Sequence, residues 1–360
     1  MYPLLMMLLG LGVPSGIAAY AYYVLNAQEN SKPKREMMPP DGMVIDSYFV
    51  AEPPQLEGAY LEKITLIDKR LHSGQLTGAN FRGAFLREAK LGRAVLIQAN
   101  LDNASLEFAN LNNANLTDAT LREANLRSAQ IEGAILLRAQ LASANLEKAL
   151  LSHSRLEEAN LERATLEQAQ LQGAHLERAN LRNANLIRAT LTNASLIEAN
   201  LEGADLREAK LGYSNFTNAT LERANMSRAL LESASLIRAN LAIAYLESAN
   251  LSKAHLEGAV LTSTHLENAI LTNAHLEGCD LRGANLQGAT LDGAYLNDAN
   301  LEGCDLRGAH LENATLSGAS LKGATLDRNI SFKGTRRPDG NLWSAGVEMG
   351  QFTASGLALD

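Results

Sequence analysis

The chain has 360 residues, a formal net charge of -8 and only 5% aromatic residues. This mildly acidic balance, with a pI near 5.5, argues against general nucleic-acid binding, because nucleic-acid-binding proteins present a basic stripe. A globular chain of this length usually forms two domains. The middle of this chain is repetitive, however, and a stacked repeat grows in one dimension without that limit.

The N-terminal region, residues 1–27, contains an uncharged apolar segment from Leu4 to Leu25. As a helix it would be about 33 Å long, which is enough to cross the hydrocarbon core of a bilayer. We therefore expect one N-terminal transmembrane α-helix that anchors the chain in a lipid bilayer. The alternative is a cleaved secretory signal, because Ala19-Tyr20-Ala21 resembles a cleavage site, although no Lys or Arg precedes the apolar segment.

Basic residues indicate on which side of the membrane the rest of the chain lies. Lys32, Lys34 and Arg35 follow the apolar segment, and no basic residue precedes it. Basic residues remain on the cytoplasmic side, so we expect a single-pass membrane protein whose main domain is cytoplasmic. A cleaved signal would instead give a secreted or periplasmic protein. Residues 28–55, which include five prolines, form the expected Pro-rich linker.

A repeat of five residues dominates residues 56–329. Every fifth residue from Leu56 to Leu326 is apolar and nearly always Leu, and the residue two positions earlier is almost always Ala. On a helix this spacing would scatter the Leu residues, at about 140° per step. If the chain instead runs extended for two or three residues and then turns, Ala and Leu point to the same side. Stacked coils would then bury them, which predicts an all-β parallel solenoid of about thirteen coils with a right-handed path.

The residue before each Leu indicates the number of sides. From position 80 to position 320 in steps of twenty, Asn occurs seven times in thirteen; from 90 to 310 it occurs twice in twelve. A coil of fifteen residues would mix these two classes, whereas a four-sided coil of twenty keeps them apart. We therefore expect four sides, with Asn80, Asn100 and their equivalents stacked as a partial amide ladder.

This pattern resembles that of the pentapeptide-repeat family, Ala-(Asp/Asn)-Leu-x-x, over about three quarters of the chain; Ala99-Asn100-Leu101-Asp102-Asn103 is a typical unit. The resemblance implies a right-handed, four-sided β-helix with Leu at its centre. It implies no catalytic motif and no cofactor. Some members of the family mimic DNA and protect topoisomerases, which gives one possible function to weigh.

Both ends of the repeat are irregular. Between Leu56 and Leu76 the Ala position holds Ile64, Lys69 and Gly74, so we expect an imperfect first coil or a cap. After Leu326 the pattern stops, and residues 330–360, which include the only tryptophan, are expected to form a C-terminal cap and tail. The alternative for this segment is an interaction or dimer surface.

Three groups of side chains are candidates for function. His255 and His275 are twenty residues apart and should stack, but two ligands do not make a zinc site, so we expect no metal. The two cysteines, Cys279 and Cys304, occupy Ala positions and are expected to be small buried side chains. Aliphatic residues in outward positions on one side form a possible partner-facing patch. These are Val95, Ile97, Ile135, Leu137, Ile197 and Ile237.

These features together predict a non-enzymatic, membrane-anchored repeat scaffold that mediates protein–protein interaction. The sequence contains no glycine-rich phosphate loop and no nucleophile–His–acid set, so we expect no enzyme activity, no cofactor and no small-molecule substrate. The alternative, a DNA mimic that regulates a topoisomerase, requires a dense acidic surface. Residues 71–330 instead contain 29 acidic and 23 basic residues, which disfavours that alternative and binding to nucleic acid.

Overall fold

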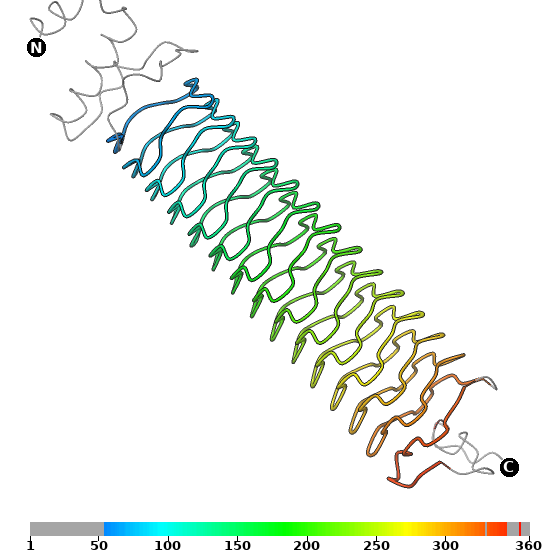
Figure 1. Ribbon diagram of the computed structural model, residues 1–360. Helices are drawn as coiled ribbons and strands as arrows, with labels where there is room; N and C mark the ends of the chain where they lie inside the picture. The colour runs from blue at the N-terminus through cyan, green and yellow to red at the C-terminus, as the bar shows by residue number, and fades with distance from the viewer. Residues whose placement is uncertain (1–53, 328–329, 344–352, 354–360) are drawn as a thin grey trace, which may run out of the picture. The chain divides into compact units, whose positions relative to one another are not determined.

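The computed structural model describes residues 54–327, 330–343 and 353 (Figure 1). The chain divides into two compact units, Met1–Gln170 and Leu171–Asp360, which we call unit 1 and unit 2 and describe separately. The expected membrane segment, Leu4 to Leu25, and nearly all of the linker at 28–55 lie outside the described residues. No helix within the described ranges is long and apolar enough to cross a membrane.

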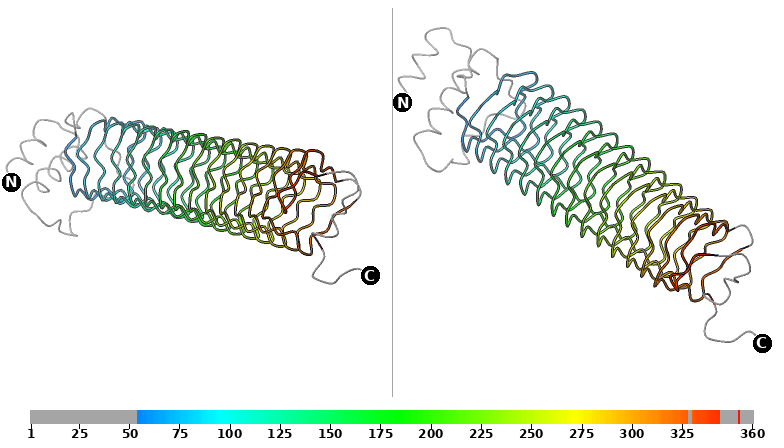
Figure 2. Two further views of the ribbon diagram at one scale, coloured as in Figure 1. Left: turned by 90° about the horizontal axis from the view of Figure 1, so that it is seen from below. Right: turned by 60° about the horizontal axis from the view of Figure 1, so that its bottom comes forward.

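Both units consist of coils of twenty residues joined by parallel β-bridges (Figures 1 and 2). Gln55 pairs with Gln75 in unit 1, and His175 pairs with Ser195 in unit 2. Each bridge involves a single residue of each coil. The described coils therefore contain no strand of two or more residues. A bridge recurs every five residues and returns to the same column after twenty, which confirms the expected four sides and parallel stacking.

We number the four sides within each unit by their first bridged residue. Sides 1 to 4 begin with Gln55, Tyr60, Thr65 and Arg70 in unit 1, and with His175, Asn180, Asn185 and Thr190 in unit 2.

Each corner is a tight turn that follows from the repeat. The carbonyl of Leu56 accepts a hydrogen bond from the amide of Ala59 at 3.1 Å, and Gly58 between them has φ 63°. A positive φ at the third residue of such a turn defines type II geometry. The turn aims Ala and Leu inward, and Ala99 and Leu101 are both fully buried. The core therefore consists of stacked Leu and Ala, as the sequence predicts.

Asparagine has a second task besides the expected stacking. In that stacking, the Asn160 side-chain amide donates to the Gln140 Oε1 of the neighbouring coil at 3.5 Å. Asn80 and Asn100 do share a column on side 2, but the Asn100 Oδ1 accepts a hydrogen bond from the amide of Asp102, two residues ahead, at 3.0 Å. Asn115 and Asn250, on other sides, bind the amides of their own corners in the same way. Asn is therefore favoured because its side chain caps the corner that follows it. An amide ladder between coils would not explain this hydrogen bond within one coil.

The first coil completes its ladder despite its irregular sequence. Arg70 on side 4 pairs with Lys90, and Ile64 is buried in the Ala position. Lys69 occupies the next Ala position and is only half-buried, since this coil lies at the start of the ladder. Gly74 is required in the third, because a Cβ there would lie 2.9 Å from the Pro54 Cγ and 3.0 Å from the Leu71 carbonyl oxygen.

The ladder continues beyond Leu326, where the sequence pattern was expected to stop. Ser331 pairs with His310 and Arg336 with Thr315, a spacing of 21 residues, so one extra residue shifts the register. Phe332 is buried beside Ser331, in the position that Leu holds elsewhere. The chain then reverses, because Arg336 also pairs antiparallel with Leu342.

The antiparallel reversal brings the only tryptophan against this last coil. The rings of Phe332 and Trp343 stack with centroids 4.6 Å apart, and the Trp343 amide donates to the Thr335 carbonyl at 2.8 Å. Residues 331–343 thus pair with the last regular coil on one side and with themselves on the other.

Candidate functional site

The aliphatic residues predicted as a partner-facing patch are half-buried on side 1 of each unit. In unit 1, Val95 pairs with Asn115, which pairs with Ile135, so a polar coil separates the two aliphatic pairs. The Thr117 hydroxyl of that coil donates to the Asn115 Oδ1 at 2.6 Å. Ile97 and Leu137 therefore lie two coils apart, and the four residues do not form one continuous apolar surface.

Unit 2 repeats this separation. Ile197 and Ile237 are half-buried, and the coil between them carries Thr217. The Thr217 hydroxyl donates to the Asn215 Oδ1 at 2.6 Å and lies 3.1 Å from the Ser235 hydroxyl. The predicted patch residues thus alternate with hydrogen-bonded polar residues in both units.

Larger apolar side chains are exposed elsewhere, and sequence reasoning did not single them out. Leu230 and Ile270 lie on side 4 of unit 2 with the polar Asn250 between them, so they too are separate, but they are 47% and 41% exposed. The sequence feature that could have identified them is a bulky apolar residue at a bridge or corner position, where many of the repeats have Asn, Ser or Thr. The others among the described residues are Ile67, Phe85 and Phe108 in unit 1, and Tyr213, Ile243, Tyr245, Val260, Tyr295 and Leu342 in unit 2.

Charged side chains pair with one another between neighbouring coils. Arg138 and Asp118 in unit 1 are joined at 2.7 Å, and Arg188 and Glu208 in unit 2 at 2.8 Å, both at a spacing of twenty residues. The hydrogen bond and positive charge of Arg138 lower the pKa of Asp118 below its ordinary value. These pairs place the two signs of charge side by side on neighbouring coils.

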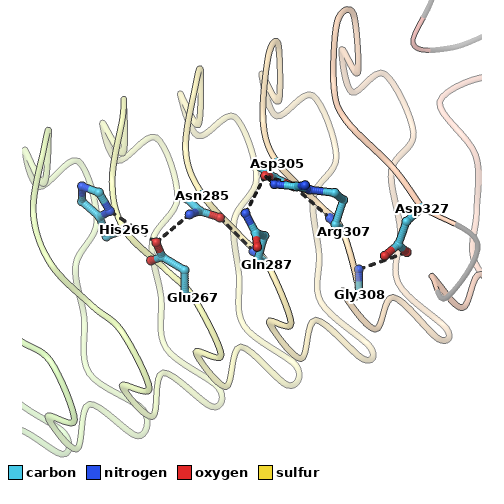
Figure 3. A network of polar contacts seen from close by, with 8 residues as sticks. All are labelled: His265, Glu267, Asn285, Gln287, Asp305, Arg307, Gly308 and Asp327. Atoms are coloured by element: carbon cyan, nitrogen blue, oxygen red, sulfur yellow. Dashed lines mark hydrogen bonds and ion pairs between the residues drawn. The ribbon is translucent and has the colours of Figure 1, made fainter.

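Side 3 of unit 2 carries a longer polar network (Figure 3). The Glu267 carboxylate accepts a hydrogen bond from the Asn285 amide at 2.6 Å and lies 3.4 Å from the His265 Nδ1. The Gln287 amide in turn donates to the Asp305 carboxylate at 2.6 Å. Asp305 also binds Arg307, which holds the pKa of Asp305 below its usual range. The network fixes these side chains to neighbouring coils.

Side 1 of unit 2 carries a column of stacked rings. His255 and His275 stack with centroids 4.6 Å apart, and Tyr295 follows at 4.7 Å, as the spacing of twenty residues predicts. Each histidine lies beside the glutamate two residues ahead: the Nδ1 of His255 is 2.9 Å from the Glu257 Oε1, and the Nδ1 of His275 is 3.4 Å from the Glu277 Oε1. The tripeptide His-Leu-Glu was not singled out from the sequence; in it, the buried Leu leaves the His and Glu side chains together on the outside of one coil.

Both cysteines are buried in Ala positions and are free thiols, as expected. The Cys279 Sγ donates to the Leu256 carbonyl and the Cys304 Sγ to the Leu281 carbonyl, each at 2.8 Å. Burial raises the pKa of both thiols to about 12. Such protonated, enclosed thiols are neither nucleophiles nor metal ligands at neutral pH.

Comparison with known families agrees with this architecture. The sequence matches the family described as "Pentapeptide repeats (8 copies)" in nine segments, the first at 55–93 and the last at 294–328. The protein belongs to the pentapeptide-repeat family. Its coils therefore belong to the right-handed quadrilateral β-helix of that family, which confirms the fold class expected for the repeat.

Three solved pentapeptide-repeat structures are similar to this protein. HetL, involved in heterocyst differentiation regulation in the cyanobacterium Nostoc sp. strain PCC 7120, is 33% identical over 68% of this chain and 92% of its own, with a TM-score of 0.26. Rfr23 from the cyanobacterium Cyanothece 51142 is 31% identical over 36% and 89%, with a TM-score of 0.20. QnrB1, a plasmid-mediated fluoroquinolone resistance protein, is 21% identical over 58% and 92%, with a TM-score of 0.28. No match was found among curated proteins.

Proposed function

We propose that this pentapeptide-repeat protein is a non-enzymatic, membrane-anchored scaffold that binds another protein through the sides of its repeat. The observation that carries the proposal is the exposure of Leu230 and Ile270 on side 4 of unit 2. Each of these exposed side chains offers apolar area whose burial against a partner would favour binding. The scaffold needs no cofactor and no small-molecule substrate.

The charge pairs disfavour the alternative function, in which the protein mimics DNA and thereby binds a topoisomerase. A DNA mimic must present unpaired negative charge over a long surface. Here Arg188 neutralises Glu208, and Arg178 neutralises Glu198, across neighbouring coils of unit 2. A supercoiling assay with a topoisomerase should therefore show no inhibition by the full chain, even in stoichiometric excess.

The contact surface has two candidates that one experiment separates. We expect Leu230 and Ile270 to carry more of the contact than the half-buried Ile197 and Ile237, because they have more apolar area to lose to a partner. Crosslinking pull-down from membranes with the full chain should recover one partner, and Leu230→Ser/Ile270→Ser should reduce that recovery. The control variant is Ile197→Ser/Ile237→Ser. A greater loss with the control variant would assign the contact to the side 1 patch. If both variants recover as much partner as the natural chain does, both surfaces are refuted.

The membrane anchor is the second half of the proposal, and the uncharged segment Leu4 to Leu25 supports it. The full chain with a C-terminal tag should sediment with membranes and resist extraction at alkaline pH. A chain without residues 1–27 should remain in the supernatant. Recovery of the intact, uncleaved full chain in the supernatant would refute the anchor, and mass spectrometry of the N-terminus would identify a cleaved signal. The same fractionation of intact and opened cells reports whether the repeat domain is cytoplasmic.

A further inference from the structure

The ring column on side 1 of unit 2 contains the donor set of a metal site. His255, Glu257 and His275 each offer a ligand atom, and these three atoms all lie within 4.8 Å of one another. Two imidazole nitrogens and one carboxylate oxygen are three of the four ligands of tetrahedral zinc, and an open site of this kind takes water as the fourth. Glu257 is the ligand that the sequence alone did not add to the histidine pair. We propose that these three residues bind a divalent transition-metal ion of the Zn²⁺ class.

The carboxylates of this column lack a permanent cation. The described ion pairs of Glu257 and Glu277 are with His255 and His275 alone, whereas acidic residues on sides 2 and 3 pair with Arg, as Glu202 does with Arg182 and Glu208 with Arg188. The Oε2 atoms of Glu257 and Glu277 are both buried without a hydrogen-bond partner. Two carboxylates on neighbouring coils, each beside an imidazole, repel each other and attract a divalent cation.

The side chains can reach the geometry that the ion needs. Zinc–nitrogen bonds of about 2.0–2.1 Å in a tetrahedron place the two nitrogens about 3.4 Å apart. The ligand atoms of His255 and His275 lie within 4.8 Å of each other, so the two nitrogens must approach by up to about 1.4 Å. Both side chains are partly exposed, at 44% and 33%, so they can rotate without disturbing the buried Leu and Ala. Glu277 beside His275 would hold that ring in orientation.

A second group with similar residues is a poorer site and provides a matched control. Glu247, His265 and Glu267 on side 3 also lie within 4.8 Å of one another, but they include one imidazole instead of two. The Glu267 Oε2 is buried without a hydrogen-bond partner as well, but the Glu267 Oε1 accepts from Asn285 and the Glu247 Oε2 accepts from the Ser227 hydroxyl. The single imidazole makes this group the poorer donor set. The buried thiols, whose pKa is raised to about 12, do not compete for the ion.

The site joins two neighbouring coils, since His255 and Glu257 lie on one and His275 on the next. Binding should therefore stabilise the fold as well as occupy the site. The test uses the full chain, purified without a polyhistidine tag and stripped of metal. Zn²⁺ alone is titrated against a chromophoric chelator, Co²⁺ is titrated for the absorption band of a tetrahedral ion, and Tm is measured with and without Zn²⁺.

We expect one Zn²⁺ per chain, a tetrahedral Co²⁺ band and a Tm raised by zinc. His255→Ala and His275→Ala should each weaken binding by more than about 100-fold, because even substitutions of outer-sphere groups cost about 10–100-fold. His265→Ala should leave the affinity unchanged. The proposal is overturned if the natural chain binds Zn²⁺ no more tightly than His255→Ala/His275→Ala, or if His265→Ala loses as much affinity. If circular dichroism shows that an alanine variant is unfolded, Glu257→Gln takes its place in the test. This variant keeps the shape of the side chain, and we expect it to lose the Co²⁺ band as well.

Discussion

The two buried thiols should make the protein sensitive to alkaline pH. Burial raises the pKa of Cys279 and of Cys304 from 9.0 to about 12. Below pH 9 both thiols are neutral in the folded and the unfolded chain, so their contribution to stability is fully present. As pH rises from 9 towards 12 the unfolded chain ionises first, and this contribution is lost. At pH 10 each thiol should subtract about 1.4 kcal/mol, and the two together about 3 kcal/mol.

Reversible guanidinium unfolding at pH 7 and pH 10 measures this loss. The control is Cys279→Ala/Cys304→Ala, which restores the Ala of the repeat at both positions and removes only the titrating groups. Tyrosine and lysine titrate alike in the two proteins, so the natural chain should lose about 3 kcal/mol more than the control over this interval. An equal loss in both would refute the burial argument. Rapid reaction of the folded chain with a thiol reagent at pH 7 would refute it as well.

Three further predictions concern the corner, the core and the surface. Gly278→Ala should cost about 1 kcal/mol in denaturant unfolding, because φ is 64° while the added Cβ meets nothing within 4 Å; a loss above about 3 kcal/mol would indicate a steric clash instead. Leu256→Ala should cost about 3–5 kcal/mol because its side chain is fully buried, whereas Leu342→Ala, 58% exposed, should change stability by less than about 1 kcal/mol. In Arg138→Gln the pKa of Asp118, followed by NMR titration, should rise towards its ordinary value; an unchanged pKa would exclude Arg138 as the cause.

Much of the fold followed from the sequence because the same physical demand recurs at every corner. Leu and Ala two positions apart can face one core only if the chain turns after each Leu, and the twenty-residue rhythm of Asn indicated four sides. The local role of Asn was missed, because a column statistic does not distinguish stacking from the capping of each corner. The final coil was missed as well: a single extra residue before Ser331 breaks the count of five, and Phe332 fits the Leu position only after that shift.

The candidate sites followed less well, because they depend on neighbours that the repeat does not encode. The stacking of His255 on His275 was predicted from spacing, but Glu257 was not recognised as a third donor, since it lies on the far side of Leu256 in the sequence. The repeat also makes every outward position look equal. Leu230 and Ile270 occupy bridge positions and are exposed, whereas Ile197 occupies a corner position and is half-buried, a difference that the apolar pattern alone does not show.

The core and the surface of each unit have different periods, and this difference constrains how the length of the chain can change. The core repeats every five residues, while a column such as His255, His275 and Tyr295 repeats every twenty. Deletion of twenty residues would return each downstream side chain to its own side. Deletion of five would leave every Leu facing inward, with little change in stability, yet would move each downstream surface residue to the adjacent side. Such a deletion between His255 and His275 would separate the two rings without disturbing the core, so a chain of this kind can lose a surface site while its fold remains intact.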